Sequence, residues 1–256
     1  MAFSVVILGA GNVGIHLAKA LHSSGYDILQ VYSRSEASAS FLAAELSSGW
    51  TIRTEDIHPG ADIYFVTVKD DALHPVLKSA PLGNKFLVHC SGSLSLQDLM
   101  EYNRECGVFY PLQTFSRNRP VDFREVPLFL EYSSEQAGSM LKQVAERLSG
   151  RVYLADSHQR MKLHISAVFA CNFVNHLYSI AASLLDEISL DFEVLHPLIR
   201  ETMLKAEVMH PREAQTGPAV RNDKRIAGKH MEALAGVPDL QELYRLMTEN
   251  IYNANK

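Results

Sequence analysis

Residues 5–14 read Val5-Val6-Ile7-Leu8-Gly9-Ala10-Gly11-Asn12-Val13-Gly14, and apolar residues then recur at helical spacing up to Leu21. A strand that runs into a Gly-x-Gly-x-x-Gly turn and then into a helix is the context that dinucleotide binding requires. Gly9 permits the tight turn, Gly11 lets the backbone approach a pyrophosphate, and Gly14 lets the helix pack closely on the strand. We predict that residues 9–14 bind a dinucleotide at the helix N-terminus, and a glycine turn without a ligand is the competing interpretation.

Short apolar runs alternate with helical stretches up to about residue 155. After the first strand they cover residues 28–32, 63–68, 86–90, 108–110, 126–132 and 152–154. Runs that are apolar on both faces and separated by helices are typical of a parallel sheet covered on both sides. The sequence therefore predicts an α/β fold whose N-terminal Rossmann dinucleotide-binding domain spans residues 1–155, with the later runs extending the sheet.

Near residue 156 the pattern changes from alternating strands and helices to helices alone, because no apolar run typical of a strand follows. Polar capping residues predict helices over 157–188, 191–209, 222–234 and 238–252. Pro197 should kink the second of these helices or mark its true start. We expect residues 156–256 to form an all-helical domain for substrate binding and dimerisation.

Residues 163–185 carry no charge and are long enough to span a bilayer. Polar residues interrupt the run at intervals of four, such as Asn172 with His176, and these form a polar stripe on an otherwise apolar helix. We interpret this segment as a buried helix of a soluble bundle. The first apolar run, residues 3–8, has no basic segment before it, so it predicts a strand and no signal peptide. We expect no membrane association.

Composition excludes several other classes of protein. The formal net charge of -5 lacks the basic excess that nucleic-acid binding uses. The odd number of cysteines, three without CxxC spacing, suits a reducing compartment, so we expect a cytoplasmic protein. No two of the eleven histidines are three or four residues apart, so no helix can present a histidine pair to a metal, and we predict no metal site.

The second strand ends in Ser33-Arg34-Ser35, close to the position where an acidic residue would bind the ribose 2'-hydroxyl of NAD. A carboxylate would repel a 2'-phosphate, whereas a hydroxyl and a guanidinium can hold it through charge-assisted hydrogen bonds. These residues favour NADP over NAD. A solvated turn at Arg34 is the competing interpretation.

Two later strand ends should also face the cofactor. Val68 and Lys69 end the run that begins at Asp62, and we expect both at the cofactor crevice. We interpret the next residues, Asp70 or Asp71, first of all as a cap of the following helix.

A third strand end reads Ser91-Gly92-Ser93. Small residues there let a nicotinamide ring and a substrate come close, so we expect Ser91 to contact the cofactor. The hydroxyls of Ser91 and Ser93, flanking Gly92, can bind a carboxylate or a carbonyl group. A plain Ser-Gly turn is almost equally compatible with the sequence.

Two further segments complete a pattern that points to a family. They are Tyr110-Pro111-Leu112-Gln113-Thr114-Phe115 and a TGP-x-x-R-x-D segment, Thr216 to Asp223, followed by His230. With the glycine turn and the helical second half, they resemble the superfamily of 6-phosphogluconate dehydrogenase-like reductases, which includes pyrroline-5-carboxylate reductase, ketopantoate reductase and the β-hydroxyacid dehydrogenases. The closest resemblance is to bacterial Rossmann-like NADP oxidoreductases. It implies an active site between the two domains, with Gln113 and Arg221 among the substrate-binding residues.

The resemblance also implies a proton donor. In β-hydroxyacid dehydrogenases a GQxxKxxNN-like motif carries a lysine that protonates the substrate oxygen. Residues 158–166 match it at Gln159 and Lys162, but Ile165 and Ser166 replace the paired asparagines. Lys162 is therefore the first catalytic candidate, and an ordinary exposed lysine is the alternative.

Two residues that follow on the same predicted helix are further catalytic candidates. His164 and Asn172 are eight residues apart and lie on similar faces, so either could hydrogen-bond the substrate. Arg221 offers a fork for a substrate carboxylate, with an ion pair to Asp223 or Glu232 as the competing interpretation.

Together these observations predict a homodimeric oxidoreductase that transfers a hydride from NADPH to the C=O carbon of a small carboxylate-bearing metabolite, such as a 2-oxo acid of the ketopantoate type. Imine reduction of the pyrroline-5-carboxylate type is the first alternative. A non-catalytic NADP-binding sensor is the second, since fold alone does not settle function. The dimer is expected through the helical domain, because the long apolar helix leaves more apolar surface than four helices readily cover.

Overall fold

A computed structural model describes residues 3–256 of the chain. The residues form two compact units that divide between His176 and Leu177. The first unit contains every strand and also the first part of the long helix that begins at Ser157. The second unit is helical.

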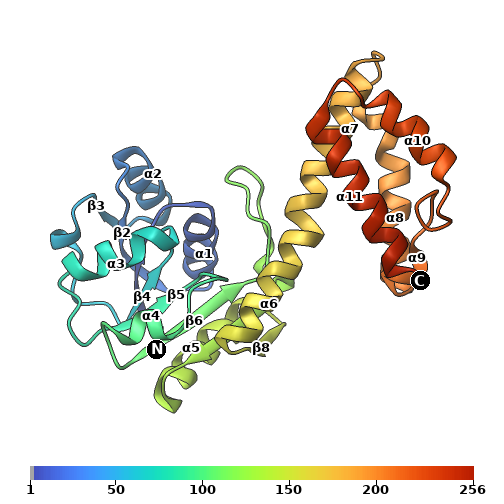
Figure 1. Ribbon diagram of the computed structural model, residues 1–256. Helices are drawn as coiled ribbons and strands as arrows, with labels where there is room; N and C mark the ends of the chain where they lie inside the picture. Colours follow the sequence, from blue (N-terminus) through green and yellow to red (C-terminus); the bar gives the residue numbers. More distant parts are fainter. Residues whose placement is uncertain (1–2) are drawn as a thin grey trace. The chain divides into compact units, whose positions relative to one another are not determined.

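The first unit is built on one sheet of eight strands in the order β3-β2-β1-β4-β5-β6-β7-β8 (Figure 1). Neighbouring strands from β3 to β6 are parallel. The order of the strands reverses between β1 and β4, as in a dinucleotide-binding fold. The predicted Rossmann fold is therefore confirmed. The strands are β1 Ser4–Leu8, β2 Asp27–Tyr32, β3 Gly49–Thr51, β4 Ile63–Val66, β5 Phe86–His89, β6 Cys106–Pro111, β7 Leu128–Tyr132 and β8 Val152–Leu154.

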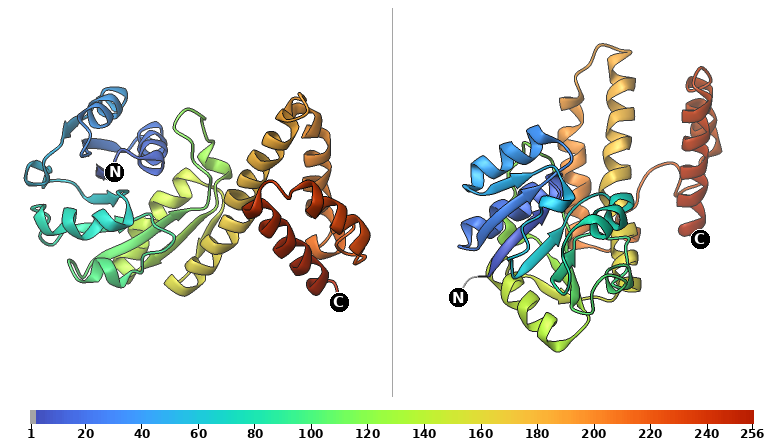
Figure 2. Two further views of the ribbon diagram at one scale, coloured as in Figure 1. Left: turned by 45° about the horizontal axis from the view of Figure 1, so that its top comes forward. Right: turned by 90° about the vertical axis from the view of Figure 1, so that its left-hand side faces the viewer.

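Helices cover both faces of this sheet (Figures 1 and 2). On one face, Ile15, Leu42 and Leu141 of α1, α2 and α5 belong to one buried cluster. On the other face, Leu73 and Leu99 of α3 and α4 belong to a second. The helices are α1 Asn12–Ser23, α2 Glu36–Leu46, α3 Asp70–Ser79, α4 Gln97–Met100 and α5 Glu135–Leu148, with short 3-10 turns η1 Thr54–Asp56 and η2 Phe123–Glu125.

The later apolar runs extend the sheet as predicted, but this end of the sheet is not all parallel. Strand β7 pairs antiparallel with β6, whereas β8 pairs parallel with β7. A parallel pair needs a crossover connection, which α5 supplies between β7 and β8. Only a loop with the η2 turn joins β6 to β7, so the chain returns in the opposite direction. The short strand β3 is also absent from the prediction, because its three residues are too few to show a periodicity.

The long helix runs from Ser157 to Asp186 and includes a π-helical segment. It consists of α6 Ser157–Ala167, the π-helical η3 Val168–Phe173 and α7 Val174–Asp186. Asp156 and Gln159 form a capping box at its start, which identifies the predicted cap as Asp156.

The prediction that this helix is buried is wrong for the single chain. Its most apolar 18-residue window has a mean hydropathy of 1.4 and none of it is buried. By length and composition alone it could cross a membrane. Large apolar side chains such as Phe169 (64% exposed) and Phe173 (50% exposed) are largely open to solvent, although their two rings meet edge to face.

The second unit contains the predicted helices and one short additional helix. Its elements after α7 are η4 Phe192–Leu195, α8 His196–Val208, α9 Pro211–Ala214, α10 Lys224–Ala233 and α11 Pro238–Ala254. Pro197 lies in the first turn of α8, so it marks the start of that helix and does not kink it. Asp223 caps α10 by accepting a hydrogen bond from the backbone N–H of Ile226 (3.0 Å).

Candidate active site

The three glycines of the turn after β1 differ in whether the surrounding chain leaves space for a side chain. Gly9 has φ +125°, and an added Cβ would lie 2.7 Å from the Thr67 carbonyl carbon. A Cβ on Gly14 would clash with the carbonyl oxygen of Gly9. A Cβ on Gly11 would meet nothing within 4 Å. The fold itself requires Gly9 and Gly14, whereas the open space over Gly11 is what a phosphate-binding turn must leave for its ligand.

The start of α1 next to this turn is open to an anion. Gly11 occupies the N-cap position, and no side chain caps the helix. Gly11 and Asn12 are exposed, while Ala10 and Gly14 are buried below them. The Asn12 side chain donates a hydrogen bond to the Phe115 carbonyl oxygen (3.0 Å), which ties the loop after β6 to the helix start. Exposed N–H groups and the positive end of the helix dipole at this point fit a diphosphate.

Arg34 lies beside a small cavity at the carboxyl end of β2. The cavity, about 190 Å³, is also lined by Tyr32, Thr54, Asp71, Ala72, Pro75 and Val76. Arg34 is exposed and, within residues 3–256, forms no ion pair. The hydroxyl of Ser33 accepts a bond from the N–H of Ser35 (3.2 Å), and the Ser35 hydroxyl caps α2 through Ser38. The guanidinium is thus free to bind an added phosphate, while Ser35 already has a structural task.

A second cavity, of about 500 Å³, is lined by several other predicted site residues of the first unit. It is lined by the carboxyl ends of β4, β5 and β6, by the loop after β6 and by one face of the long helix. Of the predicted residues it contains Asn12, Val13, Val68, Ser91, Gly92, Ser93, Gln113, His164 and Asn172. Lys69 is not among them and lies at the N-cap position of α3. Ligands bind at this edge of open α/β sheets, so we take this cavity as the candidate active site.

Tyr110, which the sequence indicated only as part of the 110–115 segment and not as a site residue, pairs with His164 inside this cavity. The Tyr110 hydroxyl and His164 Nδ1 are 3.1 Å apart, and the two rings meet edge to face. Tyr110 is the residue before the end of β6 and is only 8% exposed. Burial raises the pKa of its phenol above the ordinary value, although the charge of Arg160 lowers it in part, so the hydroxyl stays protonated at neutral pH.

The loop after β5 holds its two serines in a local network with Asp70. Ser91 Oγ accepts bonds from the N–H groups of Ser93 and Leu94 (both 3.1 Å), and Ser93 Oγ donates to the Asp70 carboxylate. The expectation that Asp70 or Asp71 caps α3 is wrong, because Lys69 occupies the N-cap position and no side chain caps the helix. Asp70 instead joins the cavity wall, where it meets a serine 23 residues away.

The face of the long helix decides which predicted catalytic residues line the cavity. His164, Ala167, Val168, Cys171 and Asn172 all do so. Lys162 is exposed and outside the lining, because at about 100° per residue it points roughly 200° away from His164. The π-helical segment Val168–Phe173 forms part of this wall, and such segments often occur at functional sites.

Arg221 lies in the second unit, in the turn before α10. It is exposed, and in the part of the chain that the structure describes it makes no ion pair with Asp223 or Glu232. Asp223 serves as the α10 cap instead. The competing interpretation of Arg221 as an ion-pair partner therefore has no support in the single chain.

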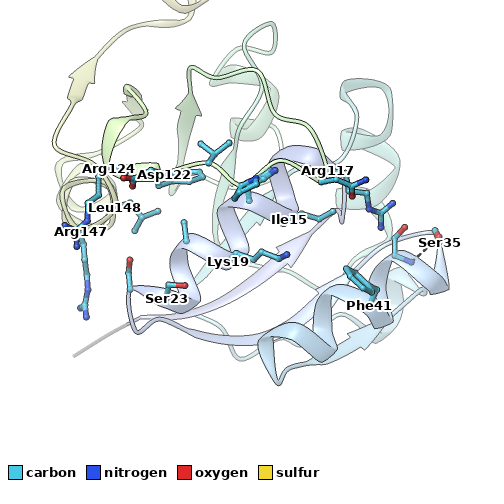
Figure 3. A pocket seen from close by; sticks show the side chains of 18 of the residues that line it. Ile15, Lys19, Ser23, Ser35, Phe41, Arg117, Asp122, Arg124, Arg147 and Leu148 are labelled. Atoms are coloured by element: carbon cyan, nitrogen blue, oxygen red, sulfur yellow. Dashed lines mark hydrogen bonds between the residues drawn. The ribbon is translucent and has the colours of Figure 1, made fainter.

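A larger cavity, of about 1160 Å³, lies between α1, α2, α5 and residues 117–124 (Figure 3). Its cations include Lys19, which pairs with Glu45 at 2.9 Å, and Arg147, which lies over the Tyr26 ring. Ser35 is the one predicted site residue in its lining. Since the polar groups at the strand ends line the smaller cavity, size alone does not identify the site.

Comparisons with known proteins agree with this architecture. Residues 4–92 match the family described as NADP oxidoreductase, coenzyme F420-dependent, and residues 126–251 match a domain of unknown function, DUF2520. No curated protein matches the chain.

Solved structures give the longest matches. A protein from Bacteroides fragilis described as a "putative NADP oxidoreductase" is 43% identical, with 98% of both chains covered and a TM-score of 0.93. A Thermotoga maritima protein is 23% identical over 98% of this chain and 99% of its own (TM-score 0.81). An imine reductase from Myxococcus stipitatus in complex with NADP+ is 18% identical over 98% and 92% (TM-score 0.63), which is a likeness of fold alone.

Proposed function

Because the chain belongs to the NADP oxidoreductase family, we propose that it reduces a C=O bond of a small carboxylate-bearing molecule and that the Tyr110–His164 pair supplies the proton to the substrate oxygen. It is an NADP-dependent oxidoreductase. The single observation that carries the proposal is this pair, which lies in the same cavity as the end of the glycine turn and the Ser91–Ser93 loop.

The residues present fit NADP. The open turn at Gly11 and the start of α1 would hold the diphosphate, and Ser33 with Arg34 would hold the 2'-phosphate. Val68 and Ser91 would border the nicotinamide end. The bound cofactor supplies the hydride, and the protein orients the substrate and excludes water.

A carbonyl substrate needs a proton on its oxygen when the hydride arrives. His164 is half-buried, and its Nδ1 is occupied by Tyr110, so Nε2 is the ring nitrogen available to a substrate oxygen. The protonated imidazole can donate from Nε2, and the Tyr110 hydroxyl holds the ring in place. Lys162 lies outside the cavity wall, which leaves His164 as the first donor to test and Lys162 as the second.

Neutral groups would bind the rest of the substrate. The Ser91 hydroxyl, the Gln113 amide and Asn172 border the cavity, whereas Ser93 donates its hydroxyl hydrogen to Asp70 and can only accept a bond from the substrate. Gln113 already accepts a bond from the Thr114 N–H (2.8 Å) through its side-chain oxygen, so its NH₂ group is the part available to a carboxylate.

One observation favours imine reduction as a second candidate. The cavity wall includes the Asp70 carboxylate, and among the described residues that line it there is no lysine or arginine. A carboxylate at this place would stabilise a cationic C=N group better than an anionic substrate. This charge balance is the reason to test both classes of substrate.

The test is a panel of 2-oxo acids and cyclic imines, each followed by loss of NADPH absorbance. We expect at least one class to be reduced, and the His164→Gln variant to lose roughly a hundred-fold or more in turnover. Tyr110→Phe should lose less, and Tyr153→Phe, at a 49% exposed tyrosine of β8, is the matched control. A His164→Gln variant that turns over normally would refute the assigned donor.

We also propose a cytoplasmic homodimer in which a second copy covers the apolar surface of the helices. Exposed apolar side chains gather along residues 165–209, among them Phe169, Ile188, Leu198 and Val208. Large exposed apolar side chains in such numbers are typical of an interaction surface. Sedimentation equilibrium should give twice the chain mass without detergent, and a monomer that needs detergent would favour a membrane instead.

A further inference from the structure

Arg160 is a fully buried arginine (0% exposed) that the proposed chemistry does not use. Its guanidinium donates hydrogen bonds to the Glu131 carboxylate, the Leu94 carbonyl oxygen and the Ser157 hydroxyl. Its Nε is buried without a partner within residues 3–256. A buried ion pair is weak grounds for inferring stability, because desolvation opposes the attraction. Arg160 does, however, hold neighbouring segments of the chain in place.

The contacts of Arg160 join three segments that are distant in sequence. Glu131 belongs to β7, Leu94 to the loop after β5, and Arg160 itself to the first turns of α6. Ser157 strengthens the same junction, because its hydroxyl donates to Glu131 (2.8 Å) and accepts from the Leu96 N–H (3.1 Å). With the bond from Arg160, the donor and both acceptor positions of this hydroxyl are used.

Two of the joined segments carry the candidate active site. The loop begins with Ser91 to Ser93, directly before Leu94, and α6 carries His164 one turn after Arg160. The loop and the imidazole are already in contact, since a Cβ added at Gly92 would lie 2.7 Å from the His164 ring. The distance between the serines and His164 therefore depends directly on how the loop is fixed to the helix.

A buried histidine fixes the other side of this loop. His89, 0% exposed, accepts a hydrogen bond from the Ser91 N–H at Nδ1 and contacts the Ser95 carbonyl oxygen at Nε2 (both 3.2 Å). Burial, and then the charge of Arg160, lower the pKa of His89 to about 4. The neutral ring with its proton on Nε2 satisfies both contacts at once.

We infer that Arg160 is a positioning residue. With Ser157 it fixes the 91–96 loop against α6, so that Ser91, Ser93 and the His164 imidazole can contact the same bound substrate. The catalytic consequence rests on the proposed function. The position of the loop does not, because it can be measured without any substrate.

The experiment is hydrogen exchange with mass spectrometry on the full chain. The main variant is the double substitution Arg160→Met with Glu131→Gln, which removes both charges and leaves no unpaired carboxylate at the junction. We expect amides of residues 91–96 to exchange roughly ten times faster, while peptides of α1 keep wild-type exchange and NADPH affinity stays within about two-fold. Arg147→Met, at an exposed arginine of the same unit, is the matched control.

A milder variant keeps the inference testable if the double variant does not fold. Ser157→Ala removes the links of this hydroxyl to Leu96, Glu131 and Arg160, and it leaves the bonds from Arg160 to Glu131 and Leu94 in place. It should therefore loosen the same loop to a smaller extent. Unchanged exchange at residues 91–96, or an increase spread evenly over the first unit, would overturn the positioning role. If no substrate in the panel is reduced, the proposed function fails, whereas faster exchange confined to residues 91–96 would still support the role of Arg160 in fixing the loop.

Discussion

Replacing Arg34 with alanine tests the cofactor site without knowledge of the substrate. The guanidinium is exposed at the end of β2 and is not engaged in an ion pair in the described chain, so a 2'-phosphate can bind it without breaking an existing contact. NADH lacks that phosphate. Arg34→Ala should therefore weaken NADPH binding and leave NADH binding almost unchanged.

The size of the effect follows from the exposure of the side chain. A hydrogen bond to a charged group contributes about 1.5 to 3 kcal/mol, and solvent around Arg34 favours the lower half of this range. About 1.5 to 2 kcal/mol corresponds to a roughly 10- to 30-fold rise in the Kd for NADPH. Higher salt should narrow the difference between wild type and variant, because the contact is screened.

Fluorescence titration of NADPH and NADH into both proteins measures the effect. Arg53→Ala is the matched control, because Arg53 is an exposed arginine nearby that already pairs with Glu55 at 2.7 Å. It should change neither affinity. Equal affinities of the wild type for the two cofactors, or an equal loss of both in Arg34→Ala, would refute the assignment of the 2'-phosphate to this residue.

Three further predictions concern the turn, the donor and acid stability. Gly11→Val should abolish NADPH binding in a folded protein, because the valine side chain fits the fold but occupies the space that the diphosphate needs. Retained NADPH affinity in a titration would contradict this prediction. Lys162→Met should keep most of its turnover, whereas a loss of roughly a hundred-fold or more would return the donor role from His164 to Lys162. Because the folded pKa of His89 is lowered to about 4, the unfolded chain binds the extra proton first, and stability should fall as pH drops from about 6.5 to 4 by up to about 3 kcal/mol. Urea unfolding of His89→Gln at both pH values should show that this part of the pH dependence is lost.

Local features of the sequence predicted the glycine turn, all the strands except β3, and two of the helix caps. The glycine spacing, the apolar strands and the caps at Asp156 and Asp223 act over a few residues, so their chemistry can be read along the chain. The three residues directly after β2, Ser33-Arg34-Ser35, carry no carboxylate and likewise favoured NADP. Helix geometry could also have separated Lys162 from His164, because both lie on one helix.

Tertiary structure alone decided the partners within the site. Tyr110 and His164 are 54 residues apart, and Ser93 and Asp70 are 23 apart, so their contacts depend on which strands become neighbours and where each strand ends. The reversal of β7 follows from a loop where a crossover helix is absent, and the burial of Arg160 follows from three segments that meet around it. No periodicity encodes such contacts, because each arises from the order of the sheet and the packing of helices on it.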